Sequence, residues 1–338
     1  MMKALQLVEA EHLKIVQMED PAINRGEVLI KVHWAGICGS DIHIFHGKNP
    51  RVKYPITLGH EFSGEIAEVG KDVSPELKLG DLVTVNPVIT CGRCEPCING
   101  RRNVCRKFGL YGIDTNGGFS QYIKVKRKHL VKIPVGVTTD LAVLSEPFAV
   151  GVHAVNRSGI KVGSRVLILG GGPIGLIVAL AAKAAGAGLI VISEISDYRL
   201  EIVKRLGFIA VDNKNTDLKK VVNDLTANNG MDVVFEAAAA PVTSLTMTSY
   251  LKSSGTAVMV GLHREPVLTD LRDVNLREIN IIGTMLYTDE DFETAVNMLS
   301  QTEHLAEIIS HRFSLEDYNI AFKTIMQDKT AMKVVIKP

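Results

Sequence analysis

The sequence predicts an α/β protein that combines a β-rich region with a doubly wound, parallel-sheet domain. Two observations predict this fold class. After about residue 150, short apolar runs alternate with helical patterns, as they do where helices connect parallel strands. Before that point, glycine and proline recur at short intervals up to about residue 120, which indicates strands joined by turns and loops.

Individual elements follow from the hydrophobic pattern. Alternation predicts a strand at 27–34, and an Ala-rich stretch predicts a helix at 173–185. A second helix is expected at 197–206. The remaining strands are expected at 165–170, 189–193, 209–211, 232–236, 256–260 and 279–283.

Composition excludes several classes of partner. The 338 residues suffice for about two domains, and 46% hydrophobic with 22% charged residues is typical of a globular chain. The net charge of +1 gives no field that would attract nucleic acid or a membrane surface, so we expect neither partner. The first residues lack an apolar signal core. Together with clustered cysteines, this predicts a reducing, cytoplasmic location.

A glycine-rich turn follows the strand at 165–170 and opens the next helix. Gly170, Gly172 and Gly175 form a Gly-x-Gly-x-x-Gly pattern, which in this context predicts a dinucleotide-binding site. The three glycines allow a tight turn, close approach of a pyrophosphate and close helix–strand packing, respectively. Pro173 fits the first helical turn, whose free N–H groups would face the phosphates.

An acidic residue ends the second strand of this region. Glu194 lies nineteen residues after Gly175, where a carboxylate accepts hydrogen bonds from the adenosine ribose and repels a 2′-phosphate. The sequence therefore favours NAD over NADP, although the nearby Arg199 leaves NADP open. A glycine turn in a domain without a nucleotide is the alternative. Further expected cofactor contacts are Ile174, Val260, Gly261 and Leu262.

Four of the five cysteines lie within fifteen residues. Cys91, Cys94, Cys97 and Cys105 give the spacing Cys-x2-Cys-x2-Cys-x7-Cys. Four thiolates close a tetrahedron around zinc and leave no open position, which is typical of a structural site. An iron–sulfur cluster also uses four thiolates, but nothing else in the chain indicates electron transfer.

The fifth cysteine belongs to a different pattern. Cys38 is followed by His60 and Glu61 and, further along the chain, by Glu146. A cysteine, a histidine and a carboxylate can hold zinc with one coordination position open, as in a catalytic site. Taken alone, Cys38 would be interpreted as a buried apolar residue and His60 as a structural histidine.

Together these features resemble the zinc-dependent medium-chain alcohol and polyol dehydrogenases, over essentially the whole chain. The resemblance is carried by the glycine-rich turn, the four-cysteine segment, Gly59-His60-Glu61 with Gly64 and Gly70, Gly117-Gly118-Phe119, and Glu146-Pro147-Phe148-Ala149-Val150. It implies zinc- and NAD-dependent oxidation of a secondary alcohol to a ketone, with two zinc ions per chain.

The family's catalytic zinc ligands correspond to Cys38, His60 and one carboxylate. Relatives differ in whether Glu61 or Glu146 completes the set directly or through water, so both stay candidates.

A proton relay is also implied by the resemblance. Ser40 is expected to accept the alcohol proton, and His43 to pass it on toward solvent. Ordinary loop hydrogen bonding is the alternative for both side chains. Asp41 is expected to orient His60.

The resemblance also implies the domain organisation. A GroES-like catalytic domain is expected at residues 1–150, with the structural zinc lobe at about 86–110. A Rossmann NAD-binding domain is expected at 151–286, and residues 287–338 complete the catalytic domain. Relatives form dimers or tetramers, so we expect a homodimer or homotetramer, with the strand at 279–285 as the joining edge.

The substrate is expected to be a small alcohol of the sorbitol or sugar-acid type. Ile44, Phe119 and Leu286 are the expected pocket residues. Sorbitol dehydrogenases carry tyrosine and arginine where this chain has Ile44 and Leu286, so sorbitol itself stays open. L-Threonine 3-dehydrogenase and 2,3-butanediol dehydrogenase are alternatives. A non-catalytic NAD-binding or redox-sensing zinc protein is a further alternative, against which the intact ligand and relay residues argue.

Overall fold

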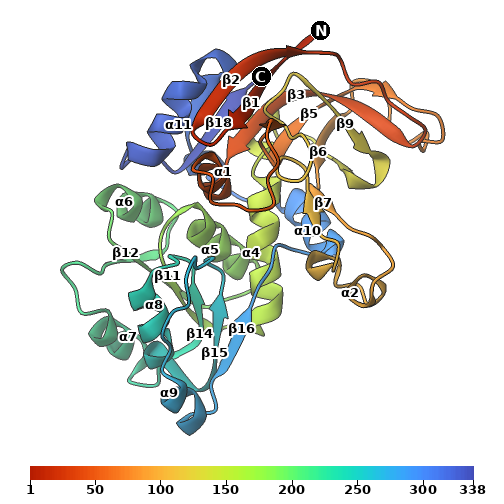
Figure 1. Cartoon of the computed structure of the whole chain (residues 1–338). Helices are drawn as coiled ribbons and strands as arrows, with labels where there is room; N and C mark the ends of the chain where they lie inside the picture. Colours follow the sequence, from red (N-terminus) through yellow and green to blue (C-terminus); the bar gives the residue numbers. More distant parts are fainter. The chain divides into compact units, whose positions relative to one another are not determined.

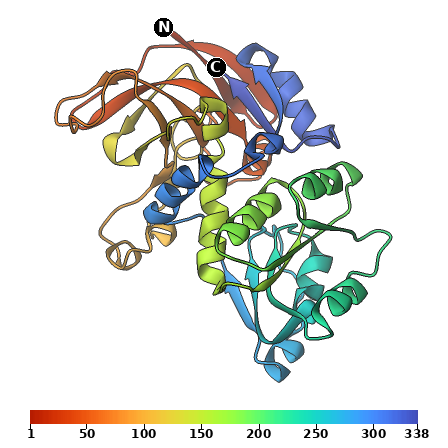
Figure 2. The same ribbon diagram turned by 180° about the vertical axis from the view of Figure 1, so that it is seen from behind.

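The structure is a computed structural model that describes all 338 residues. It divides the chain into two compact units (Figure 1). Unit 1 contains residues 1–146 and 288–338, and unit 2 contains residues 147–287. Both chain ends therefore belong to unit 1, where the C-terminal elements lie beside the N-terminal strands in both views (Figures 1 and 2).

Unit 1 is built on a seven-stranded sheet. Its order is β10-β6-β5-β3-β18-β17, and β9 also pairs with β3. The strands of this sheet are β3 (Glu27–Ile37), β5 (Glu61–Val69), β6 (Leu82–Val85), β9 (Tyr122–Lys126), β10 (Leu130–Lys132), β17 (Ile309–Ser314) and β18 (Lys333–Lys337). The central strand β3 thus joins N-terminal strands to the last strand of the chain.

Two smaller sheets complete the strands of unit 1. One has the order β2-β1-β4, and β7 pairs with β8. Their strands are β1 (Met2–Glu9), β2 (His12–Met18), β4 (Ile56–Thr57), β7 (Val88–Ile89) and β8 (Gly109–Leu110). The helices of unit 1 are α1 (Gly39–Phe45), α2 (Glu95–Ile98), α3 (Thr139–Ala142), α10 (Asp289–Leu299) and α11 (Tyr318–Gln327).

Unit 2 contains six parallel strands in the order β13-β12-β11-β14-β15-β16. The strands are β11 (Arg165–Leu169), β12 (Leu189–Glu194), β13 (Ile209–Asp212), β14 (Met231–Glu236), β15 (Leu251–Met259) and β16 (Asn280–Gly283). This order is that of a doubly wound dinucleotide fold, in which ligands bind where the order reverses, here beside β11 and β14. The predicted fold class is confirmed.

Helices connect the strands of unit 2. They are α5 (Pro173–Ala184), α6 (Asp197–Arg205), α7 (Leu218–Thr226), α8 (Pro241–Thr246) and α9 (Leu271–Leu276), and α4 (Ser145–Ser158) leads into the unit. Apolar side chains of β11, β12 and β14 form the buried core of this sheet. None of the helices of the chain is both long and apolar enough to cross a membrane.

Two predicted elements differ from the structure by more than one residue at an end. β15 begins at Leu251, five residues before the predicted start, because the polar residues of its first half hide the strand pattern. β3 extends to Ile37 rather than ending at Trp34. This extension matters for function, because it places Cys38 immediately after the strand.

Candidate functional site

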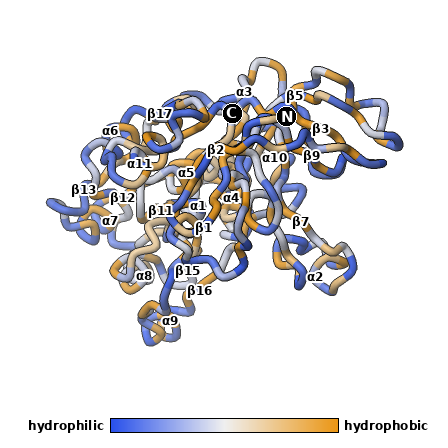
Figure 3. Tube along the Cα trace, turned by 45° about the horizontal axis from the view of Figure 1, so that its top comes forward, coloured by the Kyte–Doolittle hydropathy of each residue, from blue (hydrophilic) through white to orange (hydrophobic).

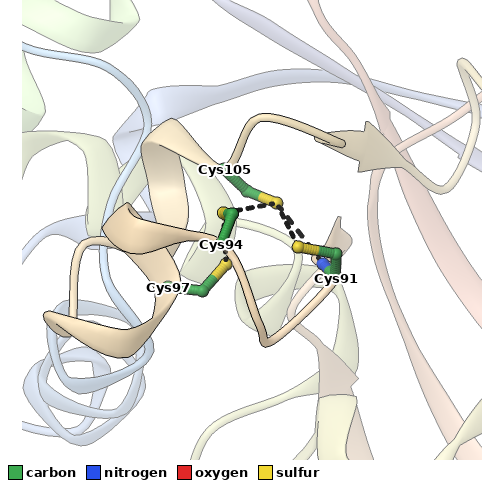
Figure 4. Close-up of side chains that lie close together, drawn as sticks. All are labelled: Cys91, Cys94, Cys97 and Cys105. Atoms are coloured by element: carbon green, nitrogen blue, oxygen red, sulfur yellow. Dashed lines mark hydrogen bonds between the residues drawn. The ribbon is translucent and has the colours of Figure 1, made fainter.

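The four-cysteine segment forms a compact thiol cluster. Its side chains point toward one another from α2 and the adjoining loops (Figure 4). The Sγ–Sγ distances are 3.4 Å for Cys94–Cys97, 3.8 Å for Cys94–Cys105 and 3.5 Å for Cys91–Cys105. A tetrahedron with Zn–S bonds of about 2.3 Å has edges of about 3.8 Å, so the cluster fits zinc. All four thiols are free of disulfides.

The electrostatics of the thiol cluster favour a cation. Backbone N–H groups of Arg93 and Cys94 lower the pKa of Cys91 to about 6. Burial and the neighbouring sulfurs raise the pKa of Cys97 to about 12. Without a cation the thiols therefore cannot all ionise at neutral pH, whereas a bound metal deprotonates coordinating thiols.

A second group of metal-binding side chains lies elsewhere in unit 1. Cys38, His60 and Glu61 bring one ligand atom each to within 4.8 Å of one another. Cys38 follows β3 and precedes α1, while Glu61 opens β5 next to His60. Because β3 and β5 pair antiparallel, with Gly36 opposite Glu61, the sheet itself brings these segments together.

The two ring nitrogens of His60 face different neighbours. Its Nδ1 lies 3.6 Å from Oδ1 of Asp41, and neither atom has a hydrogen-bond partner. Nε2 lies 3.5 Å from Oγ of Ser40. Burial lowers the pKa of His60, but the carboxylate of Asp41 and the thiol of Cys38 outweigh burial and raise it well above its usual value. The same negative groups that raise this pKa would also stabilise a metal cation bound at Nε2.

Asp41 also fixes the loop that carries the cysteine. Its Oδ2 accepts a hydrogen bond of 2.8 Å from the backbone N–H of Cys38, at the start of α1. One carboxylate oxygen of Asp41 thus binds the Cys38 backbone, and the other lies beside Nδ1 of the His60 ring. This is the position we expect of a residue that orients a metal ligand.

The two candidate carboxylates differ in their surroundings. Glu61 is 1% exposed, and both of its oxygens lie 2.7 Å from Nζ of Lys333. Glu146 is 5% exposed at the start of α4 and is not among the three side chains that converge within 4.8 Å. Sequence reasoning missed Lys333, because a single lysine in an apolar strand carries no signal of its partner.

The expected pocket residues are mostly closed off. Ile44 and Phe119 are 0% exposed, and Phe119 packs where a Cβ on Gly59 would lie. Neither side chain offers surface to a substrate in this structure. Leu286 is partly exposed and adopts a positive φ of 46°. Their contact with a substrate stays a prediction.

The glycine-rich turn of unit 2 has the geometry of a phosphate-binding turn. Gly170 has a φ of +107°, which favours glycine, and Gly172 precedes the first turn of α5. A Cβ on Gly175 would overlap the carbonyl oxygen of Gly170. Pro173 occupies the first turn of α5, whose N–H groups have no partner within the helix. This arrangement can bind a pyrophosphate.

Glu194 ends β12 beside this turn. Its Oε2 accepts a hydrogen bond of 2.8 Å from the Gly171 N–H, and its Oε1 accepts from Ile195 and Ser196. Arg199 Nη1 lies 3.8 Å from Oε2, and the buried Nε of Arg199 has no hydrogen-bond partner. The carboxylate is therefore held rigidly beside the turn, with a cation close by.

The segment after β15 is tied back to β14. The N–H groups of Val260 and Gly261 donate to the carbonyl oxygen of Glu236, and a Cβ on Gly261 would lie 2.8 Å from Glu236 Oε2. His263 Nε2 lies 3.3 Å from the same Oε2. The Glu236–His263 pair was not predicted from the sequence, although His263 directly follows Leu262. Leu262 itself is 86% exposed.

Comparison with known families gives two matches along the chain. The alcohol dehydrogenase GroES-like domain matches residues 24–135, and the zinc-binding dehydrogenase domain matches residues 173–301. Among curated relatives, a 2-dehydro-3-deoxy-L-galactonate 5-dehydrogenase of Pseudoalteromonas atlantica is 36% identical, covering 99% of this chain and 98% of the relative. A sorbitol dehydrogenase of Bacillus subtilis is 35% identical, with 100% and 97% covered. An L-threonine 3-dehydrogenase of Bacillus velezensis is 36% identical, with 94% and 93% covered.

Solved structures give the same result. The 2R,3R-butanediol dehydrogenase of Bacillus subtilis superposes with a TM-score of 0.93 at 31% identity, with all of both chains covered. A zinc-binding dehydrogenase of Sinorhizobium meliloti, bound to NADP, superposes with a TM-score of 0.92 at 32% identity, with 100% and 99% covered.

Proposed function

Because the chain belongs to the zinc-binding alcohol dehydrogenase family, we propose that it oxidises a secondary alcohol to a ketone with NAD. The substrate class that we propose is a polyol, a sugar alcohol or a sugar acid. The convergence of Cys38, His60 and Glu61 supports this proposal most strongly, because these side chains can bind zinc without filling its coordination sphere. Unit 1 would be the catalytic domain and unit 2 the nucleotide domain.

In this proposal Cys38, His60 and either Glu61 or Glu146 hold the catalytic zinc. When bound, zinc would lower the pKa of an alcohol hydroxyl and NAD would accept hydride. The chain's own groups would then manage the proton. Ser40 would accept it, and the distance of 3.5 Å between its Oγ and Nε2 of His60 supports this role. His43, one turn along α1, would pass it toward solvent.

The thiol cluster would hold the second zinc ion and stabilise its lobe. It lies apart in sequence from the Cys38 set, and its four thiolates would leave no position for a substrate. Since thiols must stay reduced to bind zinc, we keep the cytoplasm as the proposed location.

NAD is the proposed cofactor on the strength of Glu194. Its carboxylate is held beside the phosphate-binding turn by three backbone N–H groups. A 2′-phosphate would meet this negative charge, but Arg199 at 3.8 Å would reduce the repulsion. We therefore expect NAD to be preferred, and the preference is measured directly by comparing kcat/KM for the two cofactors.

A homodimer or homotetramer is the proposed assembly. β16 lies at the edge of the unit 2 sheet, where its outer side is unpaired within the chain. Exposed apolar side chains gather on this strand and the helix before it, and hydrophobic colouring recurs around α9 in Figure 3. They are Leu271 and Leu276 of α9 and Ile281 of β16, and Met285 follows two residues after the strand. Pairing of two β16 edges would cover them, so light scattering should give two or four times 36.8 kDa, and 36.8 kDa itself would contradict the assembly.

The proposed reaction is tested by measuring NAD reduction across polyols, aldonic acids, diols and threonine. Turnover of at least one polyol or sugar acid is expected. Preference for threonine would instead support the activity of the L-threonine 3-dehydrogenase of Bacillus velezensis. Preference for a 2,3-diol would support that of the butanediol dehydrogenase of Bacillus subtilis. No turnover of any alcohol by the zinc-loaded chain would contradict the proposal.

His60→Ala tests the site itself. We expect loss of turnover with NADH binding retained, because His60 belongs to unit 1 and the glycine turn to unit 2. His46→Ala is the matched control, since this exposed histidine contacts only Glu11, at 2.7 Å, among charged groups. Full turnover in His60→Ala would show that the site has been assigned wrongly.

A further inference from the structure

A buried lysine reaches the proposed catalytic zinc site from the last strand of the chain. Lys333 opens β18, and its side chain is 5% exposed. Its Nζ lies 2.7 Å from both carboxylate oxygens of Glu61 and 3.4 Å from the carbonyl oxygen of Ile37. Lysine is seldom buried unless its charge is paired, and Glu61 is its direct counter-ion, while Cys38 and Glu146 also act on its charge.

The sheet of unit 1 brings together these two residues, which are 272 positions apart. β5 and β18 lie on opposite sides of β3, where Glu61 pairs with Gly36 and Val334 pairs with Ile37. A Cβ on Gly36 would collide with Oε2 of Glu61. The missing side chain thus leaves the space in which the carboxylate extends across β3 toward Lys333.

The Glu61 carboxylate therefore has two possible cationic partners, which are a zinc ion at Cys38 and His60 and the ammonium group of Lys333. Its carboxylate belongs to the group of ligand atoms that it forms with Cys38 and His60, yet both of its oxygens contact Lys333. A carboxylate that is paired in this way is less available to a metal ion. A catalytic zinc ion needs one position free of protein ligands. With Glu146 as the third ligand, binding of Glu61 as well would fill that position.

We propose that Lys333 is a positioning residue that holds Glu61 away from the zinc, so that one coordination position stays open for the alcohol. The inference rests on the proposed zinc site, and it makes Glu146 the third protein ligand. Without Lys333, the buried Glu61 carboxylate would lose its counter-ion and turn to the zinc, because an unpaired buried charge is strongly unfavourable.

Lys333→Met tests this inference, because methionine keeps an unbranched apolar side chain and removes the charge. The measurement is the rate of zinc release from the full chain to an excess of a chromogenic chelator. Release of the catalytic zinc should slow, because a fourth protein ligand would have to dissociate first. Changes to groups around metal ligands alter affinity by about tenfold or more, which sets the expected size of the effect. The Cys38→Ser variant supplies the release rate of the thiol-cluster zinc for subtraction. Lys333→Arg should release zinc as the wild type does.

Cobalt(II) substitution gives a second readout that does not depend on activity. Added alcohol should change the visible absorption of the wild-type cobalt protein, because it enters the open position. The same addition should leave the Lys333→Met spectrum unchanged. In the double variant Lys333→Met/Glu61→Gln, the response to alcohol should return, since the amide is neutral.

The outcomes separate this inference from the proposed function. A folded Lys333→Met variant that releases zinc at the wild-type rate or faster would overturn the inference alone. If that variant does not fold, Lys333→Gln replaces it, with the same expected and contradicting results. A wild-type chain that binds no metal at Cys38 would overturn the proposed function and the inference together.

Discussion

His129 is a buried histidine that should make the stability of unit 1 fall at low pH. We expect His129→Gln to remove this pH dependence. The side chain is 4% exposed, and its Nδ1 lies 3.0 Å from the carbonyl oxygen of Asn86. Its ring meets that of Tyr111 edge-on, with centroids 5.4 Å apart. Since a carbonyl only accepts, Nδ1 donates to it. Burial, assisted by the positive charge of Lys128, lowers the pKa of His129 to about 4.

The magnitude follows from the difference between the folded and unfolded chain. An unfolded histidine has a pKa of about 6.5, so below that pH the unfolded chain binds a proton that the folded chain excludes. The free energy of unfolding therefore falls as the pH drops from about 6.5 to about 4 and is not affected further below that. At about 1.4 kcal/mol for each pH unit, the full loss is about 3 kcal/mol.

The assay is urea unfolding between pH 7 and pH 4.5, followed by the fluorescence of Trp34. This single tryptophan lies in unit 1, as His129 does. Between pH 7 and pH 4.5, the free energy of unfolding of the wild type should fall by about 2 kcal/mol more than that of His129→Gln. His12→Gln is the control, because His12 is exposed. Parallel pH profiles of the wild type and His129→Gln would show that burial of His129 does not make the free energy of unfolding depend on pH.

Two further substitutions test the two halves of the chain. Cys94→Ser should lose one zinc ion per chain, by elemental analysis, and lower the Tm of the Trp34 signal, because structural zinc contributes to folding; unchanged zinc content and Tm would argue against the structural site. Gly175→Ala should weaken NADH binding at least about tenfold in a fluorescence titration, since its Cβ would overlap a backbone oxygen of the phosphate-binding turn. Gly283→Ala is the matched control, because a Cβ there has open space, and equal NADH affinity in both variants would contradict this account of the turn.

Local patterns predicted those parts of the molecule that depend on neighbouring residues. The alternation of apolar runs and helices predicted the parallel sheet, because the inner strands of a doubly wound fold are buried on both faces. The spacing of Cys91 to Cys105 predicted the thiol cluster, because all four ligands come from one short segment.

Contacts between distant segments left no comparable signal. Lys333 reaches Glu61 across β3, because their strands β18 and β5 pair with its two sides and Gly36 of β3 has no side chain in the way. In the sequence, only Gly36 indicates this close approach. Hydrophobic alternation would place a lysine at solvent rather than in the core. The start of β15 at Leu251 was also hidden, because its first half carries polar residues that resemble a turn.

The zinc content of the wild type and of Cys38→Ser, measured beside NAD reduction and NADH binding, decides whether Cys38 holds a catalytic zinc ion. We expect two zinc ions per chain in the wild type and one in Cys38→Ser, with turnover lost and NADH affinity unchanged. Two zinc ions in Cys38→Ser, or full turnover with only one, would contradict a catalytic zinc at Cys38.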